Sequence, residues 1–188
     1  MLYVVDEVRG VTYLGNIAYV VCGESPIIKM YTADTLSPLG EGIHVKGMKD
    51  PRDIVACRHD RQLYISELGD CIWRVSTDDQ SYVKWLPTES ATGRFDAYKL
   101  SMTSRGLLVT SLPWFCTVYE YSTDDGHLLR VVQLPEYMEL LSHAIETSRG
   151  TFVVCHQGTS QDKKQWAVSE LFCVCTLCPE KKRPKCFS

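Results

Sequence analysis

The chain has 188 residues, of which 45% are hydrophobic, and a formal net charge of −3. This composition suits one globular domain with a buried core, and its charge gives no electrostatic reason to expect binding to nucleic acid or to an anionic membrane. No apolar run reaches the roughly 18 residues that a membrane-spanning helix needs, and residues 1–7 lack the cationic start of a signal peptide, so we expect a cytoplasmic protein without membrane contact.

Four successive units of short apolar runs follow along the chain, separated by Asp, Gly, Ser and Pro. Such runs are typical of β-strands, so the sequence predicts an all-β fold. The first unit, residues 10–49, has predicted strands at 11–13, 17–22, 27–32 and 42–45. The second, 50–90, has them at 54–57, 63–65, 72–75 and 82–86. The third, 91–135, has them at 99–102, 107–111, 117–121 and 129–134. The fourth, 141–161, has two, at 143–145 and 151–155, while residues 165–171 fit either one more strand or a short helix.

The units repeat with a nearly constant period. Tyr19, Tyr64, Leu108 and Phe152 stand in the second strands at steps of 45, 44 and 44 residues. The sequence Ser-Thr-Asp-Asp at 76–79 returns at 122–125. A period near 45 with four strands in each unit is typical of β-propeller blades. The sequence therefore predicts a β-propeller of about four recognisable four-stranded blades over residues 1–161.

The second unit carries a resemblance to a known family. Its pattern is D-P-x-x-I at 50–54, L-Y-I-x-E at 63–67 and I-x-x-V at 72–75, followed by an Asp-rich turn. Over residues 10–156 the chain resembles a diverged NHL-repeat protein and is similar to the wider group of six-bladed SMP-30/gluconolactonase-like propellers. The resemblance implies six blades, so four units look incomplete, as in a fragment or a shortened product. Two blade faces would then stay uncovered, and we expect self-association through them.

Two functions follow from this resemblance. In NHL-like proteins the propeller often recognises a target, which implies a non-catalytic scaffold whose loop face binds a protein partner, with RNA or a glycan as other options. The alternative is an SMP-30-like, metal-dependent hydrolase, which needs several oxygen ligands around one ion. Lys99 and His143 fall on the same predicted ring as Asp53, and a lysine there opposes a divalent cation. We therefore expect no enzyme activity and no cofactor.

Candidate partner-binding residues come from the entry to each first strand. In propellers this strand lines the axial channel, so its entry residues and adjacent loops shape a binding face. Arginine and tyrosine are favoured at interfaces, although such residues can also serve only to satisfy backbone groups at the channel mouth. The candidates are Arg9, Arg52, Asp53, Tyr98, Lys99 and His143, together with Trp114 in a loop after a second strand.

Residues 162–188 differ from the rest and are predicted to be a poorly ordered, basic, cysteine-rich tail. Its cysteines have the spacing C-x-C-x2-C-x7-C, which supplies one C-x2-C knuckle but no second one for a zinc site. We therefore expect free thiols there, with a metal site as the alternative. The tail cysteines are Cys173, Cys175, Cys178 and Cys186. The other five, at 22, 57, 71, 116 and 155, fall in or beside predicted strands and are expected to be core thiols.

Overall fold

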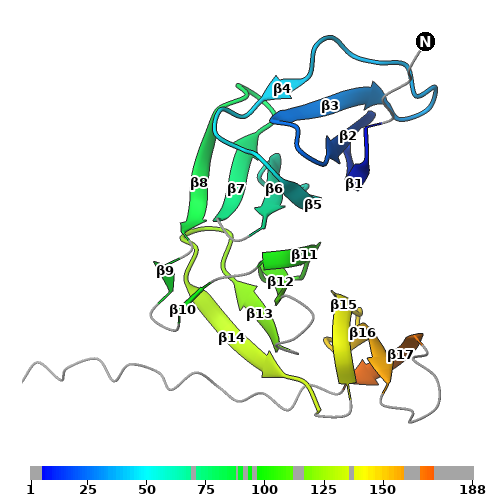
Figure 1. The fold of residues 1–188 in the computed structure, drawn as a ribbon, viewed down its shortest axis with the longest axis vertical. Coiled ribbons are helices and arrows are strands. Elements are labelled where there is room, and N and C mark those ends of the chain that lie inside the picture. Colours follow the sequence, from blue (N-terminus) through cyan, green and yellow to red (C-terminus); the bar gives the residue numbers. More distant parts are fainter. Residues whose placement is uncertain are drawn as a thin grey trace, which may run out of the picture.

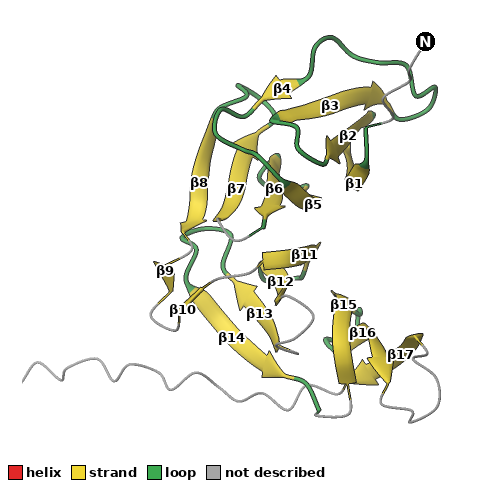
Figure 2. Cartoon of the chain, viewed as in Figure 1, coloured by secondary structure: helices red, strands yellow, loops and turns green. Residues whose placement is uncertain are grey.

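The computed structural model describes residues 6–68, 71–87, 89–90, 93–94, 97–111, 117–135, 138–158 and 166–171. All regular secondary structure in these residues is β-strand, which confirms the predicted all-β class (Figure 2). In this part of the chain no helix is long and apolar enough to cross a membrane. Trp114, Cys116 and the four tail cysteines lie outside the described residues.

The strands form four antiparallel sheets in which neighbours along the chain are also neighbours in space. The first sheet contains β1 (Val8–Leu14), β2 (Ile17–Cys22), β3 (Ile27–Thr32) and β4 (Ile43–His44). The second contains β5 (Pro51–Cys57), β6 (Gln62–Glu67), β7 (Cys71–Ser76) and β8 (Tyr82–Pro87). The third contains β11 (Ala97–Met102), β12 (Leu107–Ser111), β13 (Thr117–Tyr121) and β14 (Leu128–Gln133). The fourth contains β15 (Met138–Glu146), β16 (Phe152–Gly158) and β17 (Trp166–Leu171), and β9 (Glu89–Ser90) pairs with β10 (Gly93–Arg94) in a separate ribbon.

The four sheets follow one another around an arc, as the blades of a β-propeller do (Figure 1). The first strand of each blade, β1, β5, β11 or β15, lies on the inside of the arc, and β8 and β14 lie on its outside. Three blades have four strands, and three strands of the fourth are described. The arrangement confirms the predicted propeller of four blades.

The core lies between the blades rather than inside any one of them. Ile65 belongs to the cluster that joins the first and second blades, whereas its neighbour Tyr64 belongs to the cluster between the second and third. Because side chains alternate across a strand, each central sheet is buried on both faces. A third cluster, with Leu108 and Phe152, joins the third and fourth blades.

Several strands differ in their bounds from the sequence-based prediction, among them β5, β15 and β17. β5 begins at Pro51, earlier than residue 54, because a proline without an N–H is tolerated at the first position of a strand. β15 begins at Met138, before the predicted start of the strand at residue 143, and Met138 packs in the core between the third and fourth blades. β17 pairs with β16 from Trp166 to Leu171, so the fourth sheet continues past the predicted boundary at Gln161. Of the two options left open, a strand or a short helix, Trp166–Leu171 form a strand.

Candidate functional site

The inner strands share a β-bulge near their beginning. The pairing of β1 with β2 shifts at Arg9, that of β5 with β6 shifts at Arg52, and that of β11 with β12 shifts at Tyr98. A bulge inserts one extra residue, bends the strand and re-aims the side chain. Three predicted site residues thus occupy the same structural position in three successive blades.

The residues that resume the pairing after the shift are also equivalent. They are Gly10, Asp53, Lys99 and, in the fourth blade, His143. Gly10, which the sequence did not single out, has a packing role, since a Cβ there would lie 2.8 Å from both Asp53 Oδ1 and the backbone nitrogen of Ile54. Glycine therefore permits the close approach of the first blade to the second.

Asp53 is largely buried, with 14% of its side chain exposed. Its Oδ2 accepts a hydrogen bond of 3.0 Å from the backbone amide of Leu100, and its Oδ1 lies 3.8 Å from Lys99 Nζ. Burial raises the pKa of this carboxyl, and the Leu100 amide and the Lys99 ammonium offset only part of that rise. Asp53 therefore acts as a buried link between the second and third blades.

Lys99 joins three blades with one ammonium group. Its Nζ donates to the backbone carbonyl oxygens of Arg52, at 3.3 Å, and of Arg9, at 3.4 Å. It also lies 5.6 Å from the centre of the Tyr98 ring, within cation–π range. Among the residues that the structure describes, no group of three His, Cys, Asp or Glu side chains is placed to hold a metal ion.

Arg9 and Arg52 are partly exposed and each pairs with a carboxylate of its own blade. Arg9 Nη2 lies 2.7 Å from Glu7 Oε2, and Arg52 Nη2 lies 2.6 Å from Asp50 Oδ2. The Nε atoms of both arginines are buried and have no hydrogen-bond partner within the described part of the chain. Nearly all buried donors in proteins are paired, so these two Nε atoms are exceptions. They show that hydrogen bonding at this end of the inner strands is incomplete.

We call Arg9, Arg52, Asp53, Tyr98 and Lys99 the inner-strand rim. The structure brings these five predicted residues together, whereas His143 lies one blade further on and its Nε2 donates to the Leu100 carbonyl oxygen at 3.1 Å. Asp53, Lys99 and His143 all form hydrogen bonds with backbone groups. Arg9, Arg52 and Tyr98 are the rim residues re-aimed by bulges.

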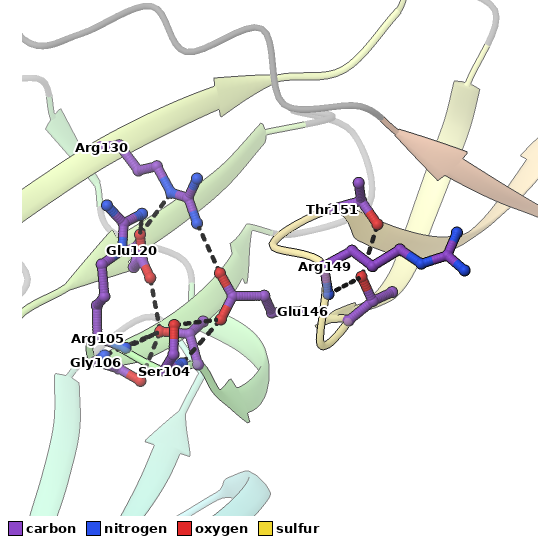
Figure 3. A network of polar contacts seen from close by, with 10 residues as sticks. Ser104, Arg105, Gly106, Glu120, Arg130, Glu146, Arg149 and Thr151 are labelled. Carbon is purple, nitrogen blue, oxygen red and sulfur yellow. Dashed lines mark hydrogen bonds and ion pairs between the residues drawn. The ribbon is translucent and has the colours of Figure 1, made fainter.

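A buried ionic network between the third and fourth blades was missed by the sequence analysis (Figure 3). Glu120 is fully buried and accepts hydrogen bonds from Arg130 and Arg105, and Arg130 also pairs with Glu146. Glu120 lies directly opposite Arg130 in the pairing of β13 with β14. The sequence did hold a signal for this pair. Each of the two adjacent strands contains one charged residue, Glu120 in β13 and Arg130 in β14, and the two charges are opposite in sign.

No family model and no curated protein matches the chain. Solved structures do match, among them a chain of a nidogen/laminin complex, with a TM-score of 0.64 and 14% identity over 82% of this chain and 58% of that one. The β-propeller domain of Cps50 (Swd1) from Myceliophteria thermophila matches with a TM-score of 0.61 and 9% identity, over 80% of this chain and 49% of that one. The WD40 β-propeller domain of Doa1 matches with a TM-score of 0.59 and 15% identity, over 80% and 48%. The chain spans about half the length of these structures, and the likeness shows the fold, a β-propeller.

Proposed function

We propose that this chain is a non-catalytic binding scaffold that recognises a protein partner at its inner-strand rim. The observation that carries the proposal is the recurrence of a bulge at Arg9, Arg52 and Tyr98 in successive blades. Bulges are over-represented next to binding and active sites because they re-aim side chains. Arginine and tyrosine are also the residue types that supply most binding energy at protein interfaces.

The charge of the rim favours a protein over RNA as the partner. Each of its three cations has a carboxylate close by, so the rim offers little of the uncompensated positive charge that drives phosphate binding. Planar guanidinium and phenol groups suit peptide carbonyls and carboxylates instead. The pairs are Arg9 with Glu7, Arg52 with Asp50 and Lys99 with Asp53.

The fold supports the same proposal in a general way. A structural neighbour comes from a nidogen/laminin complex, so a propeller of this kind occurs in a protein assembly.

We further propose that the chain is a diverged NHL-like propeller, on the strength of the pattern at residues 50–75. Free thiols at Cys22, Cys57 and Cys155 support a reducing, cytoplasmic location. Labelling of these thiols in intact cells tests the location, since modified or bridged cysteines would contradict it.

A double substitution tests the partner site. Arg9→Ala with Arg52→Ala removes both guanidinium groups, and Arg149→Ala removes an exposed arginine from a fourth-blade turn as the matched control. The wild type, the double variant and the control are first shown to have equal melting temperatures. The proteins that each form captures are then compared by quantitative mass spectrometry. We expect a defined set of captured proteins that the wild type and the control bind and the double variant does not. Identical sets from all three forms would overturn the rim as the partner site.

A metal titration tests the absence of hydrolase chemistry. Because Lys99 Nζ lies 3.8 Å from Asp53, a divalent cation would meet a fixed positive charge. We expect Ca²⁺ and Zn²⁺ to leave the melting temperature unchanged. A saturable rise that Asp53→Asn abolishes would instead support the metal-dependent hydrolase.

A further inference from the structure

A concave site lies between the second and third blades, at the opposite end of β5 from the inner-strand rim. It is a cavity of about 350 Å³ lined mainly by residues of β6, β7 and β8 and by Thr123 and Asp124 from the turn between β13 and β14. This volume is at the lower end of the range for small-molecule sites, roughly 300–1,000 Å³. The cavity therefore suits a ligand smaller than most drugs.

Tyr64 supplies an unused hydrogen-bond donor to this cavity. Its side chain is fully buried, and its ring packs edge-on against Trp85 with the ring centres 4.8 Å apart. Within the described residues the hydroxyl meets the geometry of no hydrogen bond, although Arg74 is close enough to act on its pKa, and Tyr64 lines the cavity. Burial raises the pKa of Tyr64 to about 12, so the group remains an O–H donor at neutral pH. A buried donor without an acceptor destabilises the fold, and a ligand oxygen that accepted its hydrogen bond would remove that cost.

Arg74 stands beside this donor. It lies directly opposite Tyr64 in the pairing of β6 with β7 and lines the same cavity. None of the ion pairs found within the described ranges includes Arg74. A guanidinium group next to a phenol hydroxyl forms a pair of donors that fits a carboxylate oxygen.

Two carboxylates from different blades complete the lining. Asp60 follows β5 in the second blade, and Asp124 lies in a turn of the third. Asp60 accepts hydrogen bonds from His59 Nδ1 at 2.5 Å and from Cys57 Sγ at 3.5 Å, and the bond from His59 lowers its pKa. With Arg74, the lining thus carries one positive and two negative side chains.

We propose that this cavity binds a small zwitterion of the amino-acid class. The ligand carboxylate binds the Tyr64 hydroxyl and Arg74, and its ammonium binds Asp60 and Asp124. Two carboxylates against one guanidinium favour an amino acid with a basic side chain, such as lysine, over an acidic one. Inorganic phosphate would face two carboxylates, and a neutral sugar would leave the charged groups without counter-charges. This site uses none of the rim residues and does not depend on the proposed function.

Calorimetric titration of the full chain tests the proposal with L-lysine, glycine, L-glutamate, glucose and inorganic phosphate as probes. We expect lysine to bind most tightly, glutamate more weakly, and glucose and phosphate not at all. Nα-acetyl-lysine methylamide keeps the side-chain ammonium of lysine but lacks its free α-ammonium and α-carboxylate groups. It should therefore bind at least about tenfold more weakly than lysine, since one charged hydrogen bond is worth that much. Tight binding of this analogue would overturn the free amino acid as the ligand.

Three substitutions locate the binding. Tyr64→Phe removes only the unpaired hydroxyl, so the melting temperature should stay the same or rise while lysine affinity falls about tenfold. Arg74→Gln should weaken every amino acid, and Asp124→Asn should weaken lysine more than glycine. Asp78→Asn, in an exposed ion pair outside the cavity, is the control and should leave binding unchanged. Absence of lysine binding to the wild type, or equal binding to wild type, Tyr64→Phe and Arg74→Gln, would overturn the site.

Discussion

Replacing Glu120 by glutamine removes the central charge of the network that joins the third and fourth blades (Figure 3). The Glu120 side chain is fully buried. Its Oε2 accepts hydrogen bonds from Arg130 Nε at 2.5 Å and Arg105 Nη2 at 2.8 Å, and its Oε1 accepts one from Thr103 Oγ1 at 2.6 Å. Glutamine keeps the shape of the side chain but removes its negative charge, and it places an NH2 group, which cannot accept, where one carboxylate oxygen stood.

The expected cost is dominated by Arg130. This guanidinium is 9% exposed, and besides Glu120 it pairs with Glu146 Oε1 at 3.2 Å. Removing one partner of a buried ion pair typically costs about 3–5 kcal/mol. Arg105 is 54% exposed, so the loss of its bond adds only what a surface pair contributes, about 0–1 kcal/mol. We therefore expect Glu120→Gln to lower the free energy of unfolding by about 3–5 kcal/mol.

Urea unfolding followed by circular dichroism and tryptophan fluorescence measures this loss. The matched control is Asp78→Asn, which makes the same change of charge in the Arg61–Asp78 pair, where each side chain is 60% exposed. The control should cost less than about 1 kcal/mol, as solvent-exposed pairs usually do. Equal costs for the two variants would refute the reasoning, because burial would then make no difference to the strength of the pair.

Three further predictions concern pH, the core and the fourth sheet. Burial by itself would raise the pKa of Glu146, but Ser104, Arg130 and Arg105 outweigh it and lower the pKa below the usual 4.5, so its stabilisation is present above about pH 4.5 and is lost as the pH falls through the folded-state pKa. Acid should therefore lower the urea midpoint of the wild type more than that of Glu146→Gln, and parallel curves would contradict this assignment. Ile65→Asp should abolish cooperative folding, because a buried unpaired carboxylate costs several kcal/mol of a total of about 5–15, whereas Val83→Asp, at a half-exposed position of the same blade, should still melt cooperatively. A chain ending at Gln161 lacks β17 and should lose hydrogen-exchange protection in β16, compared with a chain ending at Leu171, and equal protection would show that β17 is dispensable.

The repeat was predictable because large apolar residues recur on the buried faces of the second strands. Tyr19, Tyr64 and Leu108 each pack toward the following blade. The last step of the predicted repeat, from Leu108 to Phe152, is wrong by one residue. Leu108 pairs with Ser101 in the third blade, and the equivalent pair in the fourth blade is Val153 with Ile145. A shift of one residue moves a side chain to the other face of a sheet, and Phe152 packs back onto the third blade instead. The period was therefore visible, but not which face each residue takes.

The inner-strand rim was predictable as a position but not as a geometry. The sequence placed Asp53 and Lys99 at the entry to their strands, which the structure shows. It did not reveal the bulges at Arg9, Arg52 and Tyr98, because an extra residue is recognised only from how two strands pair.

The cavity between the second and third blades has no signal in the sequence. Tyr64 and Arg74 meet across two paired strands, and Asp124 arrives from the next blade. None of these residues forms a motif with a fixed local spacing. A site can be predicted from the sequence where the same residue types recur at equivalent positions of successive repeats. It cannot be predicted in this way where different positions of two repeats come together to form it.

The terminal blades give the last prediction, which is that the isolated 188-residue chain self-associates. The first and fourth sheets stand at the two ends of the arc (Figure 1). Val11 of β1 is 64% exposed and Val168 of β17 is 71% exposed, each on the sheet face turned away from the neighbouring blade. A net charge of −3 provides little repulsion between copies.

Sedimentation velocity over a concentration series should show dimers or larger species, because exposed apolar sheet faces drive association. Val11→Lys combined with Val168→Lys should shift the chain toward monomer. Leu36→Lys is the matched control, since Leu36 is 68% exposed but lies between β3 and β4, away from the terminal faces. A wild type that stays monomeric at every concentration would mean that these faces do not bind each other. An equal effect of Leu36→Lys would mean that association depends on exposed apolar surface in general, and not on the ends of the arc.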